Sequence, residues 1–118
     1  SHGIVFHTDA VQAFGKVTID AKLVPFDLLT ISGHKLGAPK GIGALYIRRN
    51  TPLEPMFHGG SQDRGRRPGT ENVAFAVGLA TAAELVLAEH AAESARLGAL
   101  RDALETRLRE RVPDLVVH

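Results

Sequence analysis

The sequence predicts an α/β fold, on the basis of three short apolar runs and a later change to helical periodicity. The runs occupy residues 4–6, 26–31 and 42–47, and each is bounded by Gly or polar residues. Apolar runs of this length suit strands that are buried on both faces of a sheet. From residue 71 onward, apolar residues recur at spacings of three and four, which indicates helix.

The third run follows the second after too few residues for a helical crossover. We therefore expect the third strand to lie antiparallel to its neighbour. Residues 50–70 are rich in Pro and Gly and show no periodicity, so we expect a long loop there. Long loops inside compact domains are usually functional or disordered.

Two helical stretches are expected after this loop. The first carries an apolar stripe made of Val73, Val77, Ala80, Ala83 and Leu87. The second carries a stripe made of Leu97, Leu100, Leu104 and Leu108. Thr70 is the expected N-cap of the first helix, and Glu105 and Arg109 have the favourable i,i+4 order for a pair on the second. Pro113 should end the second helix, because a proline disfavours helical backbone at the residue before it.

Composition narrows the possible classes of protein. A net charge of +1 favours neither nucleic acid nor a membrane surface as a partner. No apolar run approaches the roughly 18 residues of a membrane-spanning helix, and nothing reads as a signal peptide. The absence of Cys excludes disulfides and Cys-based metal sites and fits a reducing cytoplasm, where we expect the protein to be located. Residues 115–118 read as a strand just beginning, so we expect the chain to be one piece of a longer protein.

The densest cluster of reactive side chains, at residues 32–35, directly follows the second apolar run. A strand that ends in such a turn places the amine of Lys35 at the carboxyl edge of a sheet, where open α/β sheets bind ligands. A lysine in an apolar pocket or near a cation has a lowered pKa and can form a Schiff base. Ser32 and His34 offer hydrogen-bond donors of the kind that a phosphate group requires. The alternative is a surface turn with a solvated lysine.

A second cluster, at residues 7–12, follows the first apolar run. A buried carboxylate at a strand end, such as that of Asp9, needs a partner to stay ionised. A protonated pyridine nitrogen would be such a partner, and Gln12 could donate to an oxygen on the same ring. Alternatively, Asp9 is a helix N-cap and Gln12 a polar residue of the first turn. No metal site is expected, because His7 and Asp9 have no third ligand at a suitable spacing.

The third cluster lies in the Gly-rich loop, at residues 59–72. Arg66, Arg67 and Thr70 precede an expected helix N-terminus, which makes a credible anion site. The basic loop is short and has no interleaved aromatic residues, so it does not indicate nucleic-acid binding. The alternative is a flexible connector with solvated arginines.

The order and wording of these motifs resemble the cysteine desulfurases, a family of pyridoxal-phosphate (PLP) enzymes. The motifs are His7-Thr8-Asp9-Ala10-Val11-Gln12, Ser32-Gly33-His34-Lys35 and Arg67-Pro68-Gly69-Thr70-Glu71-Asn72. The last motif is similar to the housekeeping and nitrogenase-linked branch. The resemblance covers the whole chain and implies part of the large domain of a fold-type I PLP-dependent transferase, ending at the start of the small domain. Residues 1–90 would belong to the PLP-binding large domain, and residues 91–118 would form the connecting helix and the first strand of the small domain.

The resemblance also implies a role for each candidate residue near the cofactor ring. Lys35 would be the catalytic residue, which holds PLP as a Schiff base and moves protons once the substrate displaces it. Asp9 would pair with the pyridine nitrogen, and Gln12 would contact the ring hydroxyl.

The cofactor phosphate has its own set of residues in the resemblance. Ser32 and His34 would bind the phosphate of the same subunit. Thr70 would reach the phosphate of the partner subunit's cofactor, because the sites of this family lie at the interface of a homodimer.

The implied reaction converts L-cysteine to L-alanine and passes the sulfur, as an enzyme persulfide, to an acceptor or scaffold protein for iron–sulfur cluster or thionucleoside synthesis. The family's ring-stacking histidine lies upstream of this segment, and its persulfide-forming cysteine and substrate-binding arginine lie downstream. We therefore expect the segment alone to be inactive. Ser61 and Asp63 stand where Gly and Glu are more familiar. The alternatives are another class V aminotransferase-like PLP enzyme and a fragment that folds without cofactor.

Overall fold

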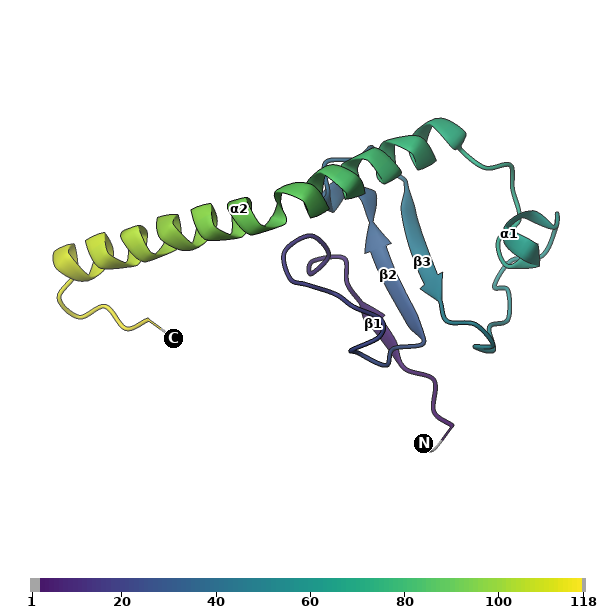
Figure 1. The fold of residues 1–118 in the computed structure, drawn as a ribbon, viewed down its shortest axis with the longest axis horizontal. Coiled ribbons are helices and arrows are strands. Elements are labelled where there is room, and N and C mark those ends of the chain that lie inside the picture. Colours follow the sequence, from purple (N-terminus) through teal and green to yellow (C-terminus); the bar gives the residue numbers. More distant parts are fainter. Residues whose placement is uncertain (1–2, 118) are drawn as a thin grey trace.

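The computed structural model describes residues 3–117, in which a three-stranded sheet is crossed by one long helix (Figure 1). The elements in chain order are β1 (His7–Asp9), β2 (Leu28–Ser32), the 3₁₀ turn η1 (Gly33–Lys35), β3 (Gly43–Ile47), α1 (Gln62–Gly65) and α2 (Val73–Arg111). The α/β class predicted from the sequence is confirmed. The long loop predicted over residues 50–70 is also confirmed, with the four-residue α1 inside it.

The strand order in the sheet is β1-β2-β3. β1 runs parallel to β2, with Asp9 opposite Thr30. β3 runs antiparallel to β2, with Gly43 opposite Ser32, which confirms the predicted orientation of the third strand. The first strand was predicted too early, since residues 4–6 precede β1. The Phe6 N–H donates to the Asp27 carboxylate at 2.9 Å, so it cannot donate to the backbone of a neighbouring strand.

Alternation along β2 separates an apolar face of the sheet from a polar one. Leu29 and Ile31 point to one face, while Thr30 and Ser32 point to the other. Leu29 is buried with Ala10 and Phe26, and Ile31 packs against both this cluster and a second one. The second cluster consists of Leu36, Leu79 and Ala82, with Phe14, Ile31, Ala38, Ile42 and Val86 packed against it. α2 therefore covers the apolar face next to the end of β2.

α2 is one continuous helix of 39 residues, where the sequence suggested two. The residues between the two predicted stripes are mainly Ala, Glu and Arg, which favour helix, and include neither Gly nor Pro to interrupt it. The N-cap is Asn72, whose side chain accepts from the Phe75 N–H at 3.2 Å, so the prediction of Thr70 as the cap was wrong. The helix ends at Arg111, before Pro113, as predicted, and Arg109 pairs with Glu105 at 2.7 Å.

Only the second predicted stripe lies on the face of α2 that packs against the sheet, because 100° per residue brings Leu97 into line with the buried Leu79. The first predicted stripe was wrong, since Val73, Val77 and Leu87 are 60–68% exposed and lie about 80–160° around the helix from Leu79. Near the sheet this face is buried at Leu79 and Ala82. Beyond the sheet it continues as Leu97, Leu100, Leu104 and Leu108, which are 41–60% exposed. Figure 1 shows this distal half of α2 projecting past the strands.

α2 also contains an 18-residue window with a mean hydropathy of 1.5, long and apolar enough by composition to cross a membrane. The expectation that no apolar run approaches the length of a membrane-spanning helix was therefore wrong, because the few Glu residues of this window do not lower its mean hydropathy enough. Length and composition alone do not separate such a helix from the core helix of a soluble protein.

Residues 115–117 do not form the strand that was predicted over residues 115–118, and His118 lies outside the described residues. A strand needs a neighbour to pair with, whereas here the Leu115 N–H donates to the Val112 carbonyl at 3.2 Å, as part of a turn. The assignment of residues 91–118 to a separate small domain stays a prediction.

Candidate functional site

The parallel pairing of β1 and β2 brings the first two candidate clusters to one edge of the sheet. Asp9 is the last residue of β1, and Ser32 is the last residue of β2, which runs straight into η1. Asp9 is paired with Thr30, which is two residues before Ser32. Asp9 and Ser32 therefore lie on the same face of the sheet. Asp9, Ser32, His34 and Lys35 therefore share the carboxyl edge, as predicted from the sequence.

Asp9 is held at the start of a tight turn. The Val11 N–H donates to Asp9 Oδ1 at 2.9 Å, and Phe14 N–H donates to the Ala10 carbonyl at 2.8 Å. Residues 11–13 form a turn and not a helix, so the alternative of Asp9 as a helix N-cap is wrong. The carboxylate remains exposed although its backbone is anchored by buried Ala10. Gln12 is also exposed, in the middle of the turn.

Glycine determines the shape of the turn that carries Lys35. A Cβ on Gly33 would lie 2.7 Å from Ile42 Cγ2, so no larger residue fits here. The Gly33 N–H donates to the Ile42 carbonyl at 2.8 Å, which ties η1 to the start of β3. Leu36, directly after Lys35, is buried against α2. The backbone on both sides of Lys35 is thus fixed, while the side chain itself is exposed.

Ser32 and His34 already contact each other. Ser32 Oγ and His34 Nδ1 share a hydrogen bond of 2.8 Å, and the His34 side chain is exposed. A hydroxyl and an imidazole side by side at a strand end are suitable partners for a phosphate oxygen. This pair lies immediately beside the amine-bearing residue Lys35.

The third cluster lies apart from the other two. Thr70 is exposed in the segment between α1 and α2, and Figure 1 shows α1 beyond β3, on the side away from β1. The backbone of α1 is left-handed at Asp63 (φ 48°) and Arg64 (φ 60°), an unusual conformation for residues other than Gly. Arg67 donates to the Pro68 carbonyl. The structure therefore does not bring Thr70 together with Asp9 or Lys35 within this chain.

One polar contact at the carboxyl edge was missed in the sequence, where His7 was considered only as a metal ligand. His7 Nε2 and Thr30 Oγ1 lie 2.7 Å apart and share a hydrogen bond. The spacing gives only part of the signal: His7 precedes Asp9 by two residues and Thr30 precedes Ser32 by two, but their pairing also depends on the register between β1 and β2. In strands, residues two apart share a face.

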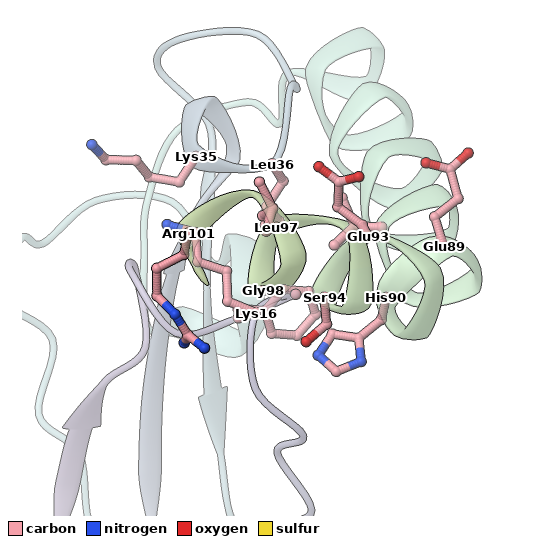
Figure 2. A pocket seen from close by; sticks show the side chains of 13 residues that line it. Lys16, Lys35, Leu36, Glu89, His90, Glu93, Ser94, Leu97, Gly98 and Arg101 are labelled. Atoms are coloured by element: carbon pink, nitrogen blue, oxygen red, sulfur yellow. The ribbon is translucent and has the colours of Figure 1, made fainter. Parts of the chain in front are cut away.

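A pocket of about 570 Å³ lies behind the turn, between α2 and residues 14–16. Its walls carry charge of both signs, from Lys16, Lys35, Glu89, Glu93 and Arg101. Arg96, through its hydrogen bonds, holds the pKa of Glu93 below its usual range. Figure 2 shows the Lys35 side chain extending away from the acidic residues of α2, so this pocket is not where Lys35 meets Asp9 and Ser32.

Comparison with known proteins agrees with this geometry. The family model described as Aminotransferase class-V matches residues 1–117. The chain belongs to the class-V aminotransferase family. Within this family, it is 54% identical over 110 residues to a cysteine desulfurase of Gluconacetobacter diazotrophicus, covering 93% of this chain and 28% of the relative. It is 52% identical over 115 residues to the cysteine desulfurase NifS of Azotobacter vinelandii, covering 98% of this chain and 29% of the relative.

A solved structure supports the fold of this class-V chain directly. The NifS-like protein from Rickettsia africae matches with a TM-score of 0.84 and 37% identity, covering 90% of this chain and 29% of that protein. The chain thus has the fold of one part of a fold-type I transferase. It spans 26–30% of the length of the curated relatives that it matches.

Proposed function

We propose that this chain is the lysine-bearing part of a PLP-dependent cysteine desulfurase, which converts L-cysteine to L-alanine and retains the sulfur for transfer. The observation that carries the proposal is the meeting of Asp9 with Ser32, His34 and Lys35 at one sheet edge. The names of relatives at 50–55% identity support the substrate.

The side chains at this edge fit PLP in their chemistry. PLP has a pyridine nitrogen, a phosphate and an aldehyde, which require a carboxylate, hydrogen-bond donors and an amine. Asp9 offers an exposed carboxylate, the Ser32–His34 pair offers donors, and Lys35 offers an exposed amine. When bound, PLP supplies an electron sink for the bonds around the substrate's α-carbon.

The chain's own residues would then divide the work. Lys35 binds the cofactor through Nζ and afterwards accepts and returns a proton at the same atom. Asp9 keeps a proton on the ring nitrogen by placing a negative charge beside it. Gln12 orients the ring through its hydroxyl. Ser32 and His34 anchor the phosphate and thereby fix the position of the ring relative to Lys35.

The proposal extends to a homodimer in which Thr70 serves the cofactor of the partner subunit. Thr70 is exposed, in the segment between α1 and α2. This position suits a contact with a second subunit better than a contact within the same chain. The sulfur would pass to an acceptor or scaffold protein, for iron–sulfur cluster or thionucleoside synthesis.

The test is product analysis on the protein that contains this chain. With L-cysteine, we expect equal amounts of alanine and sulfide, and a Lys35→Ala variant should lose at least about 100-fold in rate. Lys40→Ala is the matched control, because Lys40 lies in the next turn and is also exposed. Products other than alanine would favour another class-V activity, and full activity of Lys35→Ala would contradict the proposed site.

A further inference from the structure

We propose that His7 and Thr30 form a positioning pair that supports Asp9, and that His7 acts through Thr30 without contacting the reacting atoms. This inference rests on the proposed function, because it gives His7 a role toward the same cofactor. The hydrogen bond of 2.7 Å between His7 Nε2 and Thr30 Oγ1 is its starting point.

The sheet register places this pair beside Asp9. Thr30 is the ladder partner of Asp9, and adjacent strands lie about 4.8 Å apart, so the two side chains are neighbours on one face. His7 is on the same face, two residues before Asp9. The polar face of the sheet edge therefore carries His7, Asp9 and Thr30 together.

The hydrogen bond determines which way the Thr30 hydroxyl points. A threonine hydroxyl rotates freely unless a partner holds it. With the proton on Nε2, His7 donates to Thr30 Oγ1, and the hydroxyl hydrogen is left available to Asp9, the ladder partner of Thr30. A donor beside the Asp9 carboxylate would orient that carboxylate toward the ring nitrogen of the cofactor.

The neighbouring hydroxyl of β2 is held in the same way. Ser32 Oγ bonds to His34 Nδ1 at 2.8 Å. Both hydroxyls on the polar face of β2 are thus oriented by an imidazole, one from β1 and one from η1. Ser32 and His34 are already assigned to the phosphate, whereas the function proposed above gives no role to His7 and Thr30.

A double-mutant cycle on cofactor affinity tests the pair. Apoprotein containing this chain is equilibrated with PLP by dialysis, and the Kd is compared among His7→Ala, Thr30→Val and the double variant. Each single change should raise the Kd about three- to ten-fold, the size of one lost hydrogen bond. The double variant should be no weaker than the weaker single variant, because both changes remove the same interaction. Multiplying effects, or an unchanged Kd, would overturn the proposal.

Conservative variants separate positioning from folding. Thr30→Ser keeps the hydroxyl and His7→Gln keeps an N–H donor, so both should bind PLP within about two-fold of the unaltered protein. In an Asp9→Asn background, His7→Ala should have no further effect on the Kd. A full effect in that background would show that His7 does not act through Asp9. Failure of the unaltered protein to bind PLP would refute the proposed function itself, whereas binding that is insensitive to the pair refutes only this inference.

Discussion

At the scale of single residues, the backbone is held on both sides of Lys35. Gly33 before it is buried against Ile42, and Leu36 after it is buried against α2. The exposed amine therefore starts from a fixed point on the sheet edge. A lysine that forms a covalent bond with a bound cofactor needs such a position more than a solvated lysine does.

The labelling of Lys35 is our first prediction. Borohydride reduction of the PLP-loaded protein, followed by peptide mapping, should place the pyridoxyl group on Lys35, since Lys35 directly follows the hydrogen-bonded Ser32–His34 pair in the chain. Recovery of the label on Lys16 or Lys40 would contradict the site assignment.

Asp9 and Gln12 should differ strongly in their effect on activity. Asp9→Ala removes the charge that keeps the ring nitrogen protonated and should lower kcat/KM by about 100-fold or more, while Gln12→Ala should cost about ten-fold or less. Asp9→Asn is the matched control, because an amide oxygen can still accept from Val11 N–H. Small and equal losses in all three variants would mean that Asp9 only shapes the turn.

The candidate site was largely predictable from residue order, but one contact was not. Asp9, Ser32, His34 and Lys35 follow apolar runs directly, and parallel strands bring such positions to one edge. The His7–Thr30 contact depends on the register between β1 and β2, which the sequence does not specify for strands this short. The hydrogen bonds that Arg48 donates to the carbonyls of Phe26 and Ala21, at 2.8 and 3.0 Å, also join residues far apart in the sequence, so they depend on the tertiary structure.

At the scale of elements, the sequence indicated the distal apolar stripe of α2, but neither the buried face near the sheet nor the continuity of the helix. Leu97 has the same angular position as Leu79 on an unbroken helix. Residues 88–96, between the two stripes, have no large apolar side chains, so the sequence pattern indicated a break between two helices. Helix propensity, and not burial, bridges that gap, since residues 88–96 are mostly exposed.

Two glycines of α2 give a test of this continuous helix. A Cβ on Gly98 would meet nothing within 4 Å, so Gly98→Ala should stabilise the chain by about 0.5–1 kcal/mol through helix propensity alone. Gly78→Ala is the matched control, because its Cβ would lie 3.1 Å from Pro39 Cδ and offset the gain. Thermal unfolding followed by circular dichroism measures both, and equal stabilisation by the two changes would contradict the packing of α2 near Pro39.

At the scale of the whole molecule, the described chain is more extended than a compact domain. Its radius of gyration is 19.1 Å, whereas a compact chain of this length has about 13.5 Å. Each of its two clusters has only three buried residues. Apolar side chains such as Met56 (87% exposed) and Ile4 (81% exposed) lie on the surface. Contiguous exposed apolar surface favours association.

The 118-residue chain alone should therefore show no desulfurase turnover, and it should bind PLP weakly or not at all. It contains no cysteine on which a persulfide could form, and Thr70 is proposed to serve the cofactor of a partner subunit. Sulfide release from L-cysteine, visible absorbance of lysine-bound PLP and sedimentation would be measured on one preparation. We expect oligomers or aggregates in the sedimentation experiment.

The outcomes of this experiment separate its parts. Sulfide release that persists after external thiols are removed would contradict the expected lack of turnover. Tight, stoichiometric binding of PLP would contradict only the expected weak binding. A stable monomer would show that the exposed leucines of α2 do not drive association.

The length of α2 has a mechanical consequence. Val86 is the last residue of α2 that packs against the second cluster. Residues 87–111 extend about 38 Å farther, at 1.5 Å per residue. A tilt of about 5° at the anchored end moves the far end by about 3 Å over that length. The anchored end of α2 contains Leu79 and Ala82, which form one buried cluster with Leu36, the neighbour of Lys35. Movement of the distal half of α2 would therefore reach the turn that carries Lys35 through this cluster.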